Sequence, residues 1–217
     1  DCVISQTGFT GEKGYEIYVR DAHANAEKMW NAVLEAGEEF GLMVIAPAHH
    51  RRIAAGILSW GQDLDHETSP FQVNLSYQVP RNKKSDYIGK EELERQRAVI
   101  DEGNAPFKMK MVGITLGGKE ITNYAPDFWL VTDTDDKEVG YVTSPWWSPE
   151  LETNIALAWV PWEASEVGTK YKVKLPDEYS ETPGVSVDAE IVDIPFRESV
   201  NPNKREVEAS KGLDFAE

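Results

Sequence analysis

The sequence has little positive charge, a single cysteine and no long apolar run. Lys and Arg number 22 against 38 Asp and Glu, which gives a formal charge of −16. Because basic side chains hold nucleic acids and anionic membranes, this balance argues against both as partners. Cys2 alone excludes an internal disulfide framework and any cysteine-rich zinc or iron–sulfur site. With no bilayer-length apolar stretch and no signal peptide, we expect a soluble, cytoplasmic protein.

Motifs for metal, nucleophilic or phosphate chemistry are also missing. Of the four histidines, His49 and His50 are adjacent, so on a helix they point roughly 100° apart and make poor joint ligands. There is no Gly-x-Ser-x-Gly element, and the glycines of 8–14 precede a strand rather than a helix, unlike a phosphate-binding loop. We therefore expect no metal, and the residues alone identify no catalytic group.

The first hundred residues mix strand and helix signals. Apolar and polar residues alternate over 15–19, which predicts a half-buried strand. Three glycines over 7–14 predict a turn back to a strand over 2–5, hence a hairpin. After this strand, apolar residues recur at helical spacing, which predicts a helix that begins after an N-cap at Asp21 and ends at Gly37. Two further helices are predicted over 47–56 and 89–97. Because the chain opens at Asp1 without Met and enters a strand at once, we expect a fragment, a processed product, or one half of a longer protein with an upstream half before it.

From Phe107 the pattern changes to short β-branched and aromatic runs between turn signals, which predicts a small antiparallel barrel or sandwich. The six predicted strands are 111–116, 128–132, 139–144, 154–160, 170–175 and 185–194. The aperiodic stretch 100–106 is the predicted boundary. We thus expect an α+β portion over 1–102, a β domain over 107–197 and a polar tail over 198–217.

Several strings resemble the glycine-cleavage T-protein (aminomethyltransferase) family, in family order over nearly the whole chain. They are Thr7–Ile17 (TGFTGEKGYEI), Ile53–Asp65 (IAAGILSWGQDLD), Thr68–Phe71 (TSPF), Tyr87–Leu93 (YIGKEEL), and Val139–Ser144 (VGYVTS) with Ser148-Pro149 and Asn154–Ala158 (NIALA). The resemblance implies an α+β fold, with a ferredoxin-like α/β portion, incomplete here, followed by a six-stranded antiparallel β-barrel. It also implies tetrahydrofolate as the cofactor.

Four residues are candidates for binding the cofactor, and the resemblance itself implies two of them, Glu16 and Arg197. Glu16 matches the glutamate that binds the pterin ring, and a carboxylate suits two parallel N–H donors. Tyr18 shares its strand face. Trp146 could stack on the pterin or on a cationic substrate, or could instead close a barrel end. Arg197 lies near a family contact to folate. Asp63 and Asp65 look like an acid/base pair but are expected to cap a turn.

One departure from the family pattern bears on the reaction. Ala48 stands where many aminomethyltransferases carry an arginine, and Ala46-Pro47-Ala48 is more similar to the dimethylsulfoniopropionate demethylase branch. The sequence therefore favours methyl transfer from a small-molecule methyl donor to tetrahydrofolate. The alternatives are glycine-cleavage aminomethyl transfer, with a lipoyl carrier protein as partner, and a non-catalytic folate-binding module of a larger enzyme.

Overall fold

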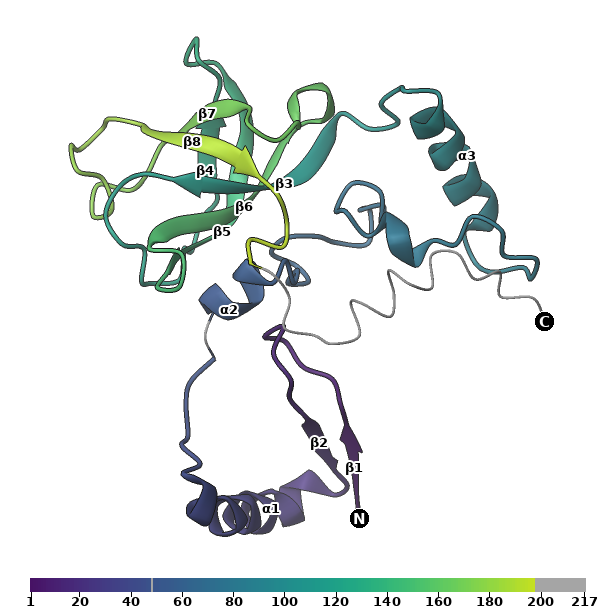
Figure 1. The fold of residues 1–217 in the computed structure, drawn as a ribbon, viewed down its shortest axis with the longest axis vertical. Helices are drawn as coiled ribbons and strands as arrows, with labels where there is room; N and C mark the ends of the chain where they lie inside the picture. Colours follow the sequence, from purple (N-terminus) through teal and green to yellow (C-terminus); the bar gives the residue numbers. More distant parts are fainter. Residues whose placement is uncertain (48, 198–217) are drawn as a thin grey trace. The chain divides into compact units, whose positions relative to one another are not determined.

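The computed structural model describes residues 1–47 and 49–197 (Figure 1), and the chain divides into two compact units between His49 and His50. Residue Ala48 and the tail predicted over 198–217 lie outside the described residues. The boundary predicted near 100–106 falls inside the second unit, and the division of the chain into domains there stays a prediction. No helix within the described ranges has the length and apolar character to cross a membrane.

The first unit is a hairpin followed by a helix. Strands β1 (Cys2–Ser5) and β2 (Glu16–Val19) pair antiparallel, with Ser5 opposite Glu16 and Cys2 opposite Val19. The glycine-rich stretch between them makes the predicted turn. Helix α1 (Ala22–Gly37) passes directly into the 3₁₀ turn η1 (Glu38–Phe40). Asp21 precedes α1 as predicted, but its side chain makes no capping hydrogen bond; its backbone carbonyl accepts from Ala24 and Asn25 instead.

The second unit contains a closed antiparallel barrel with strand order β3-β6-β5-β4-β7-β8, so the barrel and not the sandwich is correct. Its strands are β3 (Met109–Leu116), β4 (Trp129–Thr132), β5 (Glu138–Ser148), β6 (Thr153–Pro161), β7 (Lys170–Val173) and β8 (Val187–Val192). The preceding helical elements are α2 (His49–Ala54), η2 (Ser76–Gln78) and α3 (Lys90–Asp101), and η3 (Trp162–Ala164) follows β6. The helix predicted over 89–97 continues to Asp101.

Strand β6 is buried on both faces, since each residue from Asn154 to Val160 is buried and those from Ile155 on belong to two cores. Alternate residues such as Ala156 and Ala158 point into the barrel. The others, Ile155, Leu157 and Trp159, pack outside it against α2 and Val73. This second core holds the segment before the barrel against the barrel wall.

The chain after β8 returns to α2, and two glycines make room for it. A Cβ on Gly56 would lie 2.3 Å from Ile194 Cγ2, and one on Gly113 would lie 2.7 Å from Ile194 Cγ1. Gly56 also has a φ of +70°, which favours glycine. The Phe196 N–H donates to the Ala54 carbonyl at 2.9 Å. These contacts place Arg197 beside the C-terminal end of α2.

Candidate functional site

The carboxylate of Glu16 lies on the hairpin of the first unit, where two hydroxyl groups hold it. The Thr7 hydroxyl donates to Glu16 Oε2, and the Tyr18 phenol donates to the same oxygen at 3.1 Å. Tyr18 reaches it because alternate residues of a strand share a face. The structure therefore brings together two of the four predicted site residues. Thr7 is a third residue of this hydrogen-bonded group. It lies in the TGFTGEKGYEI string, but nothing in the sequence indicated that it contacts Glu16.

The second oxygen of this carboxylate is available for a ligand. Both hydrogen bonds go to Oε2, so within the described residues Oε1 accepts none. Each carboxylate oxygen can accept about two hydrogen bonds. Glu16 and Tyr18 are both exposed, and Tyr18 keeps 55 % of its surface accessible. The hairpin thus presents an oriented carboxylate whose Oε1 can accept N–H donors of a ligand.

The other two predicted residues belong to the second unit. Trp146 on β5 is half-buried and packs against the core outside the barrel, together with Ile194 and Phe196. Arg197 follows directly, with a side chain only 12 % exposed, and its Nη1 lies 3.2 Å from Glu150 Oε2. Trp146 and the segment that carries Arg197 therefore border the same core.

His50 lies near enough to Arg197 and Glu150 for their charges to act on it. The sequence indicated only that His50 is a poor metal ligand together with His49. Burial lowers the pKa of His50 below 6.5, and the cations of Arg51 and Arg197 lower it further, whereas Glu150 raises it. His50 is therefore more readily neutral near pH 7 than an exposed histidine, which leaves one ring nitrogen as a hydrogen-bond acceptor.

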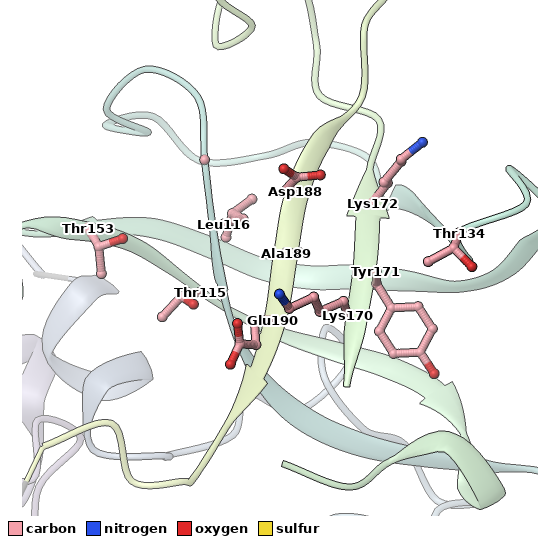
Figure 2. A pocket seen from close by; sticks show the side chains of 11 residues that line it. Thr115, Leu116, Thr134, Thr153, Lys170, Tyr171, Lys172, Asp188, Ala189 and Glu190 are labelled. Atoms are coloured by element: carbon pink, nitrogen blue, oxygen red, sulfur yellow. The ribbon is translucent and has the colours of Figure 1, made fainter. Parts of the chain in front are cut away.

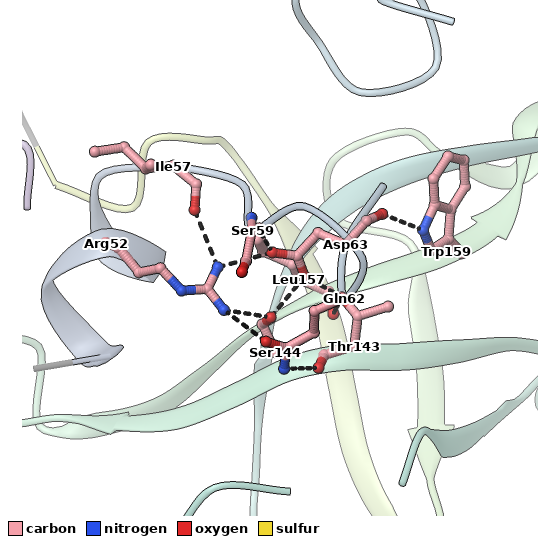
Figure 3. A network of polar contacts seen from close by, with 9 residues as sticks. All are labelled: Arg52, Ile57, Ser59, Gln62, Asp63, Thr143, Ser144, Leu157 and Trp159. Atoms are coloured by element: carbon pink, nitrogen blue, oxygen red, sulfur yellow. Dashed lines mark hydrogen bonds and ion pairs between the residues drawn. The ribbon is translucent and has the colours of Figure 1, made fainter. Parts of the chain in front are cut away.

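A polar network in the second unit centres on a buried ion pair (Figure 3). The Arg52 guanidinium, on α2, donates to Asp63 Oδ2 at 2.7 Å and to the Ser144 hydroxyl at 2.7 Å. The Arg52 and Asp63 side chains are 2 % and 0 % exposed. Asp63 Oδ2 also accepts the Ser59 N–H at 2.8 Å, so the turn-capping role predicted for Asp63 is confirmed.

The same carboxylate connects this loop to the barrel. The hydroxyls of Thr143 and Ser144 on β5 each donate to Asp63 Oδ1 at 2.6 Å. The Trp159 indole N–H on β6 donates to the Asp63 carbonyl at 3.0 Å. With four donors on its two oxygens, the Asp63 carboxylate is a structural anchor and is poorly placed for proton transfer.

Asp65, two residues further on, has a different environment. It is exposed, and its Oδ1 accepts the Glu67 N–H at 2.9 Å and the Thr68 hydroxyl at 3.0 Å. These hydrogen bonds, that of Glu67 first, lower the pKa of Asp65. Asp63 and Asp65 thus both bind backbone N–H groups, and they do not form an acid/base pair.

Two family models match the chain in order. The GCVT N-terminal domain matches residues 1–83, and the glycine cleavage T-protein C-terminal barrel domain matches residues 109–197. The chain belongs to the glycine cleavage T-protein family. Its barrel and its Glu16 hairpin both lie within these matched ranges.

Named relatives of this T-protein chain are similar over about half of their own length. An aminomethyltransferase from Geobacillus sp. (strain WCH70) is 33 % identical over 196 residues, which cover 89 % of this chain and 49 % of that protein. One from Oceanobacillus iheyensis is 36 % identical over 175 residues, covering 80 % and 44 %. The crystal structure of glycine cleavage system aminomethyltransferase T from Bartonella henselae superposes with a TM-score of 0.70 at 23 % identity, covering 90 % and 50 %, which shows the shared fold.

The barrel of this T-protein chain also carries an open concavity of about 440 Å³ on its outer wall (Figure 2). Its charges are matched across the strands, with Lys170 opposite Glu190 and Lys172 opposite Asp188. Such a balanced surface has little preference for an ion of either sign. Among the residues that the structure describes, no three His, Cys, Asp or Glu side chains are grouped to hold a metal ion.

Proposed function

We propose that the protein containing this chain transfers a one-carbon unit to tetrahydrofolate, as an aminomethyltransferase. The observation that carries this proposal is the match to both T-protein domains in family order, with Glu16 inside the first. The relatives named above are aminomethyltransferases, so the comparisons favour this function over the demethylase that the sequence pattern around Ala48 suggested.

In this proposal Glu16 binds the pterin ring. The ring of tetrahydrofolate carries an amino group beside a ring N–H, and Oε1, which accepts no hydrogen bond from the described residues, can accept from both donors. Thr7 and Tyr18 hold the carboxylate by Oε2, so its orientation is set before the ligand arrives. An oriented carboxylate loses less rotational freedom on binding, which favours affinity. We assign Glu16 a binding role, with Tyr18 as its positioning residue.

Trp146 and Arg197 remain candidates for contacts to folate or donor. Arg197 is held by Glu150 and by the segment that packs on α2. A guanidinium at this position suits a carboxylate of the folate or of the donor. Trp146 offers an aromatic face of which part stays accessible, which suits a flat ring or a cationic group.

The aminomethyl reaction has a lipoyl carrier protein as its donor partner. Transfer of the aminomethyl carbon to tetrahydrofolate releases ammonia, whereas transfer of a methyl group releases none. The second candidate is folate-dependent demethylation of a small methylated compound, which the Ala46-Pro47-Ala48 departure favours. The two functions are therefore distinguished by donor and by product.

The test is an assay of the full-length protein with tetrahydrofolate and either an aminomethylated lipoyl carrier or dimethylsulfoniopropionate. With tetrahydrofolate present, we expect ammonia release when the aminomethylated carrier is the donor and no reaction when dimethylsulfoniopropionate is the donor. Formation of 5-methyltetrahydrofolate from the methyl donor would establish the second candidate instead. Folate binding without turnover of any donor would indicate the non-catalytic module.

Glu16→Ala tests the binding residue in the same protein. Loss of a charged hydrogen-bond partner should weaken tetrahydrofolate binding by about 1–3 kcal/mol, or about 5- to 150-fold in the dissociation constant. Glu27→Ala, an exposed carboxylate on α1, is the matched control and should leave affinity unchanged. Equal affinity of the Glu16→Ala protein and the wild type would remove Glu16 from the site.

A further inference from the structure

A small pocket of about 190 Å³ lies between α3, the 70–81 segment and the start of β3, all in the second unit. Neither T-protein domain match covers the residues that α3 contributes to it. The pocket combines aromatic and charged side chains: Phe71, Arg81, Arg97, Asp101, Lys110 and Trp162.

The pocket is positive although the chain is strongly acidic. Three cations, Arg81, Arg97 and Lys110, face a single carboxylate, Asp101, which gives the pocket a charge of 3 − 1 = +2. Arg81 and Asp101 neutralise one another through a bidentate pair at 2.6 and 2.9 Å. The other two cations therefore account for the excess charge.

Arg97 and Lys110 are positioned by aromatic rings rather than by carboxylates. The Arg97 guanidinium carbon lies 4.9 Å from the centre of the Phe71 ring, and Lys110 Nζ lies 5.2 Å from that of Trp162. Within residues 1–47 and 49–197 no carboxylate is in ion-pair distance of either cation. A cation–π contact holds a charge in place without cancelling it. Both cations consequently remain able to attract an anion.

The walls of the pocket are fixed by hydrogen bonds at both ends. The Asn74 amide donates to the Met111 carbonyl at 2.9 Å, and the Met111 N–H donates to the Gln72 carbonyl at 2.8 Å, which ties the 70–81 segment to β3. Arg97 Nη2 donates to the Val79 carbonyl and ties the same segment to α3. The two cations thus project from anchored elements, so little ordering is needed to bind a ligand.

We propose that this pocket binds a small organic dianion, either a phosphate monoester or a compound with two carboxylates. A ligand charge of −2 matches the two cations that lack a carboxylate partner. The Arg97 guanidinium suits paired oxygens, and the aromatic rings provide an apolar wall for a short carbon skeleton. The pocket belongs to the second unit and Glu16 to the first, and the proposed binding of a dianion does not depend on folate transfer.

The test is isothermal titration calorimetry of the full-length protein with inorganic phosphate and, separately, glutarate, at constant ionic strength set with sodium chloride. We expect at least one of them to bind with a dissociation constant of about 1 mM or lower. Binding of phosphate alone assigns the phosphate class, and binding of glutarate alone assigns the dicarboxylate class. Saturable binding of neither anion would overturn the proposal.

Variants locate the binding. Lys110→Met keeps an unbranched side chain over Trp162 but removes the charge, and should raise the dissociation constant at least about tenfold. Arg97→Lys, which keeps the charge and loses the planar donors, should weaken binding to a smaller extent. Lys170→Met on β7 removes an exposed cation elsewhere and should have no effect. If Lys110→Met binds like the wild type, or if Lys170→Met weakens binding equally, the assignment to this pocket is wrong.

Discussion

The buried Arg52–Asp63 pair predicts a large loss of stability on Asp63→Asn. The substitution preserves shape but removes the charge opposite Arg52, whose side chain is 2 % exposed. It also places an NH₂ group where a carboxylate oxygen accepts donors from Ser59 and Arg52, or from Thr143 and Ser144. At Oδ2 two N–H donors would then face a donor, and at Oδ1 the two hydroxyls would have to rotate to accept from it.

The magnitude follows from the charge left behind. Breaking a buried ion pair by removing one partner costs about 3–5 kcal/mol, because the remaining charge is desolvated without compensation. For a chain of this size each kcal/mol lowers the melting temperature by about 2–4 °C. Asp63→Asn should therefore lower it by about 6–20 °C.

The assay is urea and thermal unfolding of the wild type, Asp63→Asn, Arg52→Met and the double variant. The sum of the losses of unfolding free energy in the two single variants should exceed the loss in the double variant by at least about 1 kcal/mol. The reason is that the double variant leaves neither charge buried without a partner. The Trp159 indole N–H resonance should also shift in Asp63→Asn, because this group donates to the Asp63 carbonyl. A loss below about 1 kcal/mol, or strictly additive costs, would refute the reasoning.

Other features of the second unit support shorter tests. The pKa of His50, measured by NMR titration, should lie below 6.5, so its contribution to stability is present above pH 6.5 and is lost as the pH falls. Glu150→Gln should lower this pKa further, and a rise would contradict the role of Glu150 in raising it. Gly56→Ala should cost more than Gly61→Ala, since both have positive φ but a Cβ at Gly56 alone meets another residue; equal costs would disprove the steric argument. Hydrogen bonding to Arg95 lowers the pKa of Glu92 to about 2. The wild type should therefore be more stable than Glu92→Gln by an amount that is complete above pH 4.5 and shrinks towards pH 2. A stability difference that does not change with pH would show that the pKa of Glu92 is not lowered.

The sequence predicted the features that depend on neighbouring residues. Period-two alternation placed Glu16 and Tyr18 on one strand face, and the Tyr18–Glu16 hydrogen bond agrees with it. Turn signals separated the six strands that form the barrel. The prediction that Asp63 binds a backbone N–H was also local, because Ser59 is only four residues away. Family strings correctly indicated the T-protein fold, since they preserve such local patterns over the chain.

Only the tertiary structure showed which distant residues meet. Asp63 and Ser144 are 81 positions apart, yet the Ser144 hydroxyl donates to the Asp63 carboxylate. They meet because β5 lies beside β6 in the closed barrel and the segment that precedes the barrel packs on its outer wall. The positive pocket around Arg97 and Lys110 likewise requires α3 and β3 to lie against one segment. A residue's own sequence neighbourhood determines backbone periodicity and turn preference. The partner of a buried charge, by contrast, depends on strand order and chain packing, which no short stretch of sequence encodes.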